Sequence, residues 1–177
     1  FQVKPSEVIF TSGATESINL AIRGFLQGKP KGHLITSALE HKAVLEVFHA
    51  LELEGWEVTY LVDIAELDRS IRADTVLVSL MLVNNELGTI LDYQAVLDIC
   101  ERRGICFHAD ATQAIGKLAL ISASFSSTCA DTTGACIVPR KWARTVIDGT
   151  RLRRQIAPSS NSEEIVAICE SGTLVPF

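Results

Sequence analysis

The chain has 177 residues, 47% hydrophobic and 21% charged, so it can bury one sizeable core but hardly two. Its formal net charge of −5 argues against a nucleic-acid-binding domain, which needs a basic face to meet phosphates. No apolar run is long enough to span a bilayer and the first residues lack a signal-peptide pattern, so a cytoplasmic chain without a membrane partner is expected.

The first two thirds of the chain alternate short β-compatible runs with amphipathic runs. This is the pattern of an α/β fold with a mostly parallel sheet and helices on both faces. Strands are expected at 7–11, 33–37, 57–61, 75–83 and 105–109, and helices at 17–26, 39–53, 64–72 and 93–103. The near-continuous apolar run at 75–83 predicts the centre of the sheet.

The five cysteines are an odd number and include no C-x-x-C pair, so neither a disulfide framework nor a zinc site is indicated. Cys100 and Cys106 are expected to be small core residues. The chain begins without a methionine, inside an α/β pattern, so we expect it to be a fragment.

Polar residues follow several expected strands, where the ligand crevice of an open α/β sheet lies. The turn 12–16, Ser-Gly-Ala-Thr-Glu, could hold a phosphate on free N–H groups at a helix N-terminus, or could be a plain N-cap. His41 could stack on a flat cofactor or cap a helix. The stretch 84–86 places two amides and a carboxylate at a strand end. Asp110, three residues before Gln113, could bind a ligand or cap the next turn. The sequence immediately around Asp110, taken alone, favours the cap.

The periodic pattern ends near residue 121. Two segments are therefore expected: an α/β core at 1–121 and a divergent, poorly patterned segment at 122–177. In the second segment the only element expected is a helix at 163–169.

Four short motifs in strand order resemble the large domain of pyridoxal-phosphate enzymes of the class V aminotransferase group, and cysteine desulfurase most of all. They are Ser-Gly-Ala-Thr at 12–15, Glu-His-Lys at 40–42, Asn-Asn-Glu-Leu-Gly at 84–88 and Asp-Ala-Thr-Gln at 110–113. The match covers residues 7–120 almost without a gap. It implies a three-layer fold, incomplete here, in which 1–121 is the cofactor-binding core.

The resemblance also implies a cofactor, pyridoxal 5'-phosphate, and roles for six residues. Ala14 and Thr15 would hold its phosphate, His41 would stack on its ring, Asn85 and Gln113 would contact its phenolic oxygen, and Asp110 would pair with its ring nitrogen. A carboxylate beside that nitrogen keeps it protonated, which makes the ring an electron sink, so for Asp110 the ligand role replaces the cap. Of these residues, His41 is the one expected to be catalytic.

The resemblance further implies a substrate and partners. The family reaction converts cysteine to alanine and leaves persulfide sulfur on the enzyme, which passes to sulfur-acceptor proteins, as in iron–sulfur cluster assembly. A homodimer is expected, and neither a metal nor a nucleic acid.

The resemblance stops where the family carries its Schiff-base lysine, in a Ser-x-His-Lys segment about two dozen residues after the glutamine. Thr128 and Cys129 stand in place of that His-Lys pair. Lys141 has the wrong neighbours and is expected to be a surface residue, and Lys117 matches an ordinary family position. None of the five cysteines lies in a context that matches the sulfur-accepting role.

We therefore expect a chain that is inactive or impaired and binds its cofactor non-covalently. Because Ser-Gly-Thr-Leu at 171–174 resembles the family again, we hypothesise a reading-frame slip that is restored downstream. A segment translated in the wrong frame would have no reason to present an apolar face, so residues 122–169 are expected to pack poorly against the sheet.

Two alternatives stay open at this point. One is another class V activity, such as a selenocysteine lyase, an aminotransferase or a kynureninase-like hydrolase, because these share the cofactor residues. The other is a non-catalytic module that keeps the pocket as a vestige and serves in binding or dimerisation. The absence of a glycine-rich fingerprint disfavours a nucleotide-binding domain.

Overall fold

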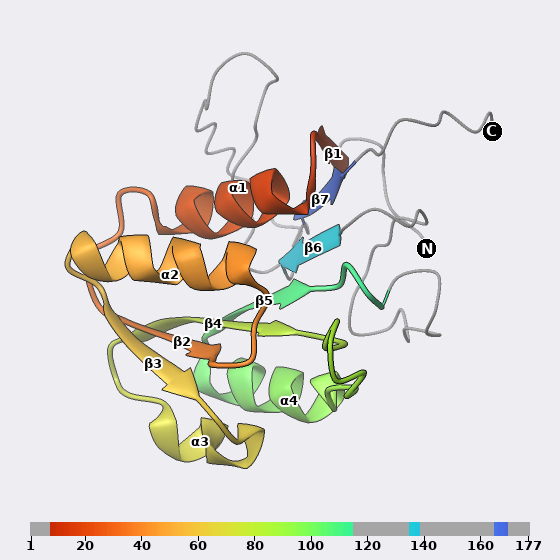
Figure 1. Ribbon diagram of the computed structural model, residues 1–177. Helices are drawn as coiled ribbons and strands as arrows, with labels where there is room; N and C mark the ends of the chain where they lie inside the picture. Colours follow the sequence, from red (N-terminus) through yellow and green to blue (C-terminus); the bar gives the residue numbers. More distant parts are fainter. Residues whose placement is uncertain (1–7, 115–134, 139–164, 170–177) are drawn as a thin grey trace, which may run out of the picture.

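The computed structural model describes residues 8–114, 135–138 and 165–169, which form one seven-stranded sheet with helices on both faces (Figure 1). Across the sheet the strand order is β1-β7-β6-β5-β4-β2-β3. The strands are β1 (Val8–Thr11), β2 (His33–Ser37), β3 (Glu57–Leu61), β4 (Thr75–Met81), β5 (Cys106–Asp110), β6 (Ala135–Val138) and β7 (Ile165–Cys169). The helices are α1 (Ala14–Leu26), α2 (Lys42–Leu53), the 3-10 turn η2 (Ile64–Glu66), α3 (Leu67–Ser70) and α4 (Tyr93–Arg103).

All strand pairs are parallel except those made by β6, which runs antiparallel to both β5 and β7. The prediction of a mostly parallel α/β sheet is therefore confirmed. Because β1, β2, β4 and β5 run in one direction, their carboxyl ends meet at one edge. That edge carries the polar turns that the sequence singled out.

Side chains alternate between two cores, one on each face of the sheet. On one face Leu34, Leu77 and Cys106 pack under α1 and α2. On the other face Phe107 and Ala109 pack against α4 and α3. The register pairs Leu77 with Cys106 and Met81 with Asp110, so β4 and β5 present matching residues to each face. Cys100 and Cys106 are both free and buried, as predicted, and they lie in different cores.

The helix α4 shows how local sequence sets an element. Asp92 caps its start by accepting a hydrogen bond from the Ala95 N–H at 3.2 Å. Gly104 ends it in the left-handed conformation, with φ of 69°, which a residue with a side chain rarely adopts. The predicted helix 93–103 is confirmed, and β5 follows within two residues.

Several expectations about the elements were wrong. The expected helix at 163–169 is a strand, because Ile165–Cys169 fits between β1 and β6. The run 135–138, for which no element was expected, is also a strand. Both join the sheet, so these parts of the late segment do not stand apart from it. The strand β5, rather than β4, has three strands on each side.

Several boundaries also moved; for example, α1 begins at Ala14 rather than at residue 17. The helix α2 begins at Lys42 rather than at residue 39, and β4 ends at Met81 rather than at residue 83. The expectations for Lys117, Thr128, Cys129, Lys141 and residues 171–174 lie outside the described residues. Within the described residues, no helix has the length and apolar character that crossing a membrane requires.

Candidate active site

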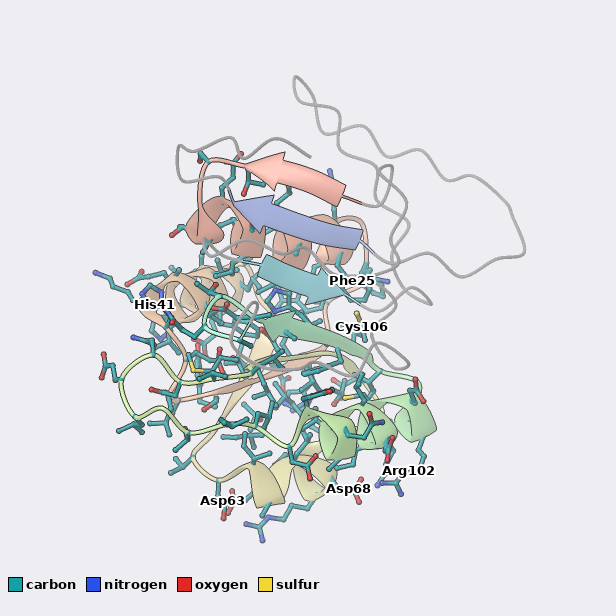
Figure 2. All side chains as sticks on the ribbon, turned by 90° about the vertical axis from the view of Figure 1, so that its right-hand side faces the viewer. Phe25, His41, Asp63, Asp68, Arg102 and Cys106 are labelled. Carbon is teal, nitrogen blue, oxygen red and sulfur yellow. The ribbon has the colours of Figure 1, made fainter. Side chains whose placement is uncertain are left out.

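A cavity of about 140 Å³ lies at the carboxyl edge of the sheet. Figure 2 shows His41 on the side toward which the arrowheads of β1, β5 and β7 point, whereas Cys106 lies at the other end of β5. Residues from four separate segments line the cavity: Ala14, Ile18, His41, Met81, Val83, Asn85, Asp110, Thr112 and Gln113. Five of the six predicted cofactor residues thus come together, and their roles as cofactor contacts stay predictions.

The sixth, Thr15, lies next to this cavity rather than in it. It lines a groove of about 350 Å³ between α1 and α2, which it shares with His41 and Lys42. His41 borders both spaces, so the groove and the cavity are neighbours.

The turn before α1 is held by its own side chains. The Ser12 N–H and Oγ–H both donate to Glu16 Oε2, at 2.7 and 2.6 Å. These two hydrogen bonds hold the pKa of Glu16 below its usual value. Thr11 Oγ1 lies 2.6 Å from Ser17 Oγ. The plain Ser/Thr N-cap is not formed, because Gly13 occupies the N-cap position and makes no side-chain hydrogen bond; instead Glu16 of the first turn reaches back to Ser12. The N-terminus of α1 faces the cavity at Ala14, where backbone N–H groups favour an anion.

His41 occupies the N-cap position of α2. Its Nδ1 accepts a hydrogen bond from the Ala43 N–H at 3.1 Å, which places the ring proton on Nε2 in the neutral form. The ring is exposed and borders the cavity. The two alternatives for this residue are compatible, because the cap fixes the ring and leaves its face available.

Asp110 ends β5 with its side chain buried at 6% exposure. Its Oδ1 accepts two hydrogen bonds, from the Thr112 N–H at 2.9 Å and from Thr112 Oγ1 at 2.5 Å. The cap that the local sequence favoured is therefore formed, and the role of Asp110 at the ring nitrogen stays a prediction. The cap uses Oδ1, and the carboxylate also lines the cavity beside Met81, its neighbour in register.

Asn84 shapes the loop after β4, and Asn85 borders the cavity. Asn84 is 8% exposed, and its Oδ1 accepts hydrogen bonds from the N–H groups of Glu86 and Leu87 at 2.9 and 2.8 Å. The loop closes at Gly88, whose φ of 69° suits a residue without a side chain. Asn85 itself is exposed.

Glu40 is the residue that the sequence interpretation passed over. It is 6% exposed, and its Oε1 accepts a hydrogen bond from the Met81 N–H at 2.9 Å. Within the part of the chain that the structure describes, its Oε2 is buried and has no hydrogen-bond partner. Burial raises the pKa of Glu40 to about 8; the negative charge of Asp110 adds to the rise, and the Met81 hydrogen bond opposes it. The sequence carried one signal of its importance: Glu40 lies between the end of β2 and the predicted site residue His41.

A buried histidine lies below the site. His108 shares the face of Asp110, two residues along β5, and its Nδ1 lies 2.7 Å from Ser79 Oγ. Burial lowers the pKa of His108 to about 3, so the ring stays neutral at physiological pH. It is a structural residue rather than a proton donor at the cavity.

The family model for class-V aminotransferases matches residues 1–125 of the chain. This chain belongs to the class-V aminotransferase family. Within the family it is cysteine desulfurase-like, because it is 54% identical over 124 residues to the cysteine desulfurase IscS of Pectobacterium carotovorum. That match covers 64% of this chain and 30% of the relative, so the chain spans about a third of the length of that curated protein.

Solved structures give the same result. A structure titled SspA in complex with cysteine superimposes with a TM-score of 0.63 at 41% identity, over 68% of this chain and 37% of that chain. A NifS-like protein superimposes with a TM-score of 0.62, also at 41% identity, over 66% of this chain and 35% of that chain. These likenesses support the class-V aminotransferase fold over about two thirds of the chain.

Class-V aminotransferases and cysteine desulfurases depend on pyridoxal phosphate. The residues of this site fit that cofactor: a helix N-terminus at Ala14 suits its phosphate, a buried carboxylate at Asp110 suits its ring nitrogen, and an exposed ring at His41 suits its face. None of the described residues that line the cavity is a lysine. The nearest described lysine in sequence to a lining residue is Lys42, which borders the α1–α2 groove.

Proposed function

We propose that this chain is the cofactor-binding part of a cysteine desulfurase-like protein and that it binds pyridoxal 5'-phosphate without a covalent bond. The observation that carries the proposal is the cavity itself. Five predicted residues from four segments, spread from position 14 to position 113, line one space at the edge where parallel sheets bind ligands.

In this proposal each residue has a physical task. The N–H groups at the start of α1 bind the phosphate, with Thr15 at its outer side. His41, fixed by its cap, covers one face of the ring, and Asn85 and Gln113 donate to the phenolic oxygen. Asp110, held by Thr112, stabilises a proton on the ring nitrogen.

When bound, the cofactor would supply an electron sink for bond cleavage at the substrate carbon. The proposed substrate is cysteine or a related amino acid, and the parent reaction gives alanine and persulfide sulfur. We propose that this chain carries out that reaction poorly or not at all, because the sequence shows no Ser-x-His-Lys segment. A homodimer and sulfur-acceptor partners follow from the same likeness and belong to the proposal.

The test is binding of pyridoxal phosphate to the purified chain, followed by absorbance and by quenching of protein fluorescence, with and without borohydride reduction. We expect saturable binding that dialysis reverses, no reduced adduct by peptide mass spectrometry, and no sulfide release from cysteine. Asp110→Asn removes the charge beside the ring nitrogen and should weaken binding; Asp98→Asn on α4 makes the same change on an exposed surface away from the cavity. Equal affinity in the two variants would contradict the proposed site.

A chain that fails to bind the cofactor at all would favour the non-catalytic binding or dimerisation module. Release of selenide but not sulfide, or amino-group transfer, would favour another class V activity.

A further inference from the structure

Two backbone segments border the cavity, and each holds the other. The first is the turn 38–41 between β2 and α2, which ends at His41, and the second is the loop 82–89 after β4, which carries Asn85. Glu40 of the turn accepts a hydrogen bond from the N–H of Met81 at the end of β4, at 2.9 Å. Asn84 of the loop donates its Nδ2–H to the carbonyl of Leu39, also at 2.9 Å. In both bonds the turn 38–41 accepts: the side chain comes from the turn in the first bond and from the loop in the second, and Met81 is the last residue before that loop.

Both segments are stiffened from within. In the turn, the Leu39 N–H donates to Ser37 Oγ at 3.0 Å. In the loop, Asn84 exchanges backbone hydrogen bonds with Thr89 and Gly88, at 2.9 and 3.0 Å. The two hydrogen bonds between the segments, here called cross-bonds, therefore connect segments that are each internally hydrogen-bonded.

The bonding residues are buried and the residues next to them are exposed. Glu40 and Asn84 are 6% and 8% exposed, whereas His41 and Asn85, the next residue in each case, are exposed at the cavity. A buried hydrogen bond keeps its strength because water does not compete for it. Each exposed site residue thus has a buried anchor at the preceding position.

We propose that Glu40 and Asn84 are positioning residues, which together hold the His41 turn in register with the Asn85 loop over the cavity. The inference deepens the proposed function, since it takes His41 and Asn85 to be the groups whose spacing matters. Neither Glu40 nor Asn84 touches the cofactor in this account; both act through the residue that follows.

The two cross-bonds made by Glu40 and Asn84, which we call the clamp, depend on the charge of Glu40. The titratable groups around Glu40 are Asp110 at the end of β5, the adjacent His41, and Asp68 and Asp92, which line a second groove of about 430 Å³ together with Glu40. Burial, with a smaller contribution from the charge of Asp110, raises the pKa of Glu40 to about 8, so Glu40 is mostly a neutral acid at neutral pH. When Glu40 ionises, the added charge at the cavity edge opposes the binding of an anionic cofactor.

The first experiment needs no cofactor. Hydrogen–deuterium exchange is measured on the unliganded chain and on Glu40→Ala and Asn84→Ala, with Glu101→Gln, an exposed position on α4, as the control. We expect each alanine variant to speed exchange in both segments, 38–41 and 82–89, while β5 and α4 stay protected. A change confined to the mutated segment, or a uniform rise across the sheet, would overturn the clamp.

The second experiment measures the dissociation constant for pyridoxal phosphate between about pH 6 and 9. Glu40→Gln keeps an acceptor for the Met81 N–H and cannot ionise. We expect Glu40→Ala and Asn84→Ala to weaken binding about tenfold, which is the size of one lost buried hydrogen bond. The wild-type chain should lose affinity above about pH 8, and Glu40→Gln should not.

Identical pH profiles for the wild-type chain and Glu40→Gln would refute the inference while leaving the proposed function intact. A wild-type chain that binds no cofactor would refute the proposed function, and the exchange experiment would still decide whether the clamp exists.

Discussion

Replacing Glu40 by glutamine should make the stability of this protein less dependent on pH. The pKa of Glu40 rises from its ordinary value of 4.5 to about 8 in the folded chain, chiefly because the carboxyl is buried. Between these two pH values the unfolded chain has released this proton and the folded chain keeps it. The free energy of unfolding therefore falls as pH rises, by up to about 1.4 kcal/mol per pH unit from this group alone.

The sign follows from proton binding. The stabilising contribution of neutral Glu40 is fully present below about pH 4.5 and is lost as pH rises through about 8. Over the two pH units from about 5.5 to 7.5 the upper limit is roughly 2.7 kcal/mol, and relaxation around a buried charge reduces it to about 1–2 kcal/mol. The glutamine side chain of the Glu40→Gln variant is neutral at every pH, so this part of the slope should vanish.

The assay is equilibrium urea unfolding, followed by circular dichroism at several pH values for the wild-type chain, Glu40→Gln and Glu101→Gln. We expect the advantage of Glu40→Gln over the wild-type chain to grow by about 1–2 kcal/mol from about pH 5.5 to 7.5. The free energy of unfolding of the exposed Glu101→Gln variant should change with pH in parallel with that of the wild-type chain. If the curve for Glu40→Gln is also parallel, Glu40 is not held neutral by the fold and the reasoning fails.

Four further predictions concern other parts of the chain. Thr112→Val removes one of the two bonds to Asp110 Oδ1 and should weaken pyridoxal phosphate binding by about three- to tenfold, whereas Thr112→Ser should not; titration of both variants checks this. Phe107→Ala in the core under α4 should lower the free energy of unfolding by about 3–5 kcal/mol, and Phe107→Leu by much less, as measured by urea unfolding. Gly104→Ala should cost about 1 kcal/mol in the same assay, because it places a side chain at a φ of 69°. Translating the encoding DNA in the other frames from residue 128 to about residue 169 should reveal Ser-x-His-Lys, followed by the Gly-Pro-containing turn that comes after it in the family that the chain resembles; if no frame contains them, the chain is a lysine-free relative rather than a lesioned one.

The fold of residues 8–114 could be predicted because its local signals agree with one another. The apolar runs, Gly104 after α4 and the polar residues at strand ends all point to helices and parallel strands in order. The strand Ile165–Cys169 was missed because a short apolar run has no periodicity that separates strand from helix. It forms a strand because it pairs with β1 and β6. A local sequence pattern does not reveal such pairing between separate segments.

The site could be predicted less completely than the fold. Residues at strand ends, such as His41 and Asp110, were found because parallel strands bring those ends together. Glu40 was not found, because its importance depends on burial and on the N–H of Met81, a backbone group 41 positions away. Sequence patterns show where a side chain starts, but they do not show which backbone group it reaches.

The sheet order has a consequence for synthesis of the chain. The strand β1, which leads into the turn and helix that carry Ala14, pairs only with β7 among the described strands. The strand β7 is joined in turn to β5, which carries Asp110, through the intervening β6. A segment made earlier in synthesis therefore obtains its sheet partner from a segment made much later. Until residue 169 leaves the ribosome, β1 has an unpaired edge and α1 is held mainly through its packing on α2. The two halves of the cavity are thus brought into register late, and shortened products that end before β7 should be prone to aggregation and should bind the cofactor poorly.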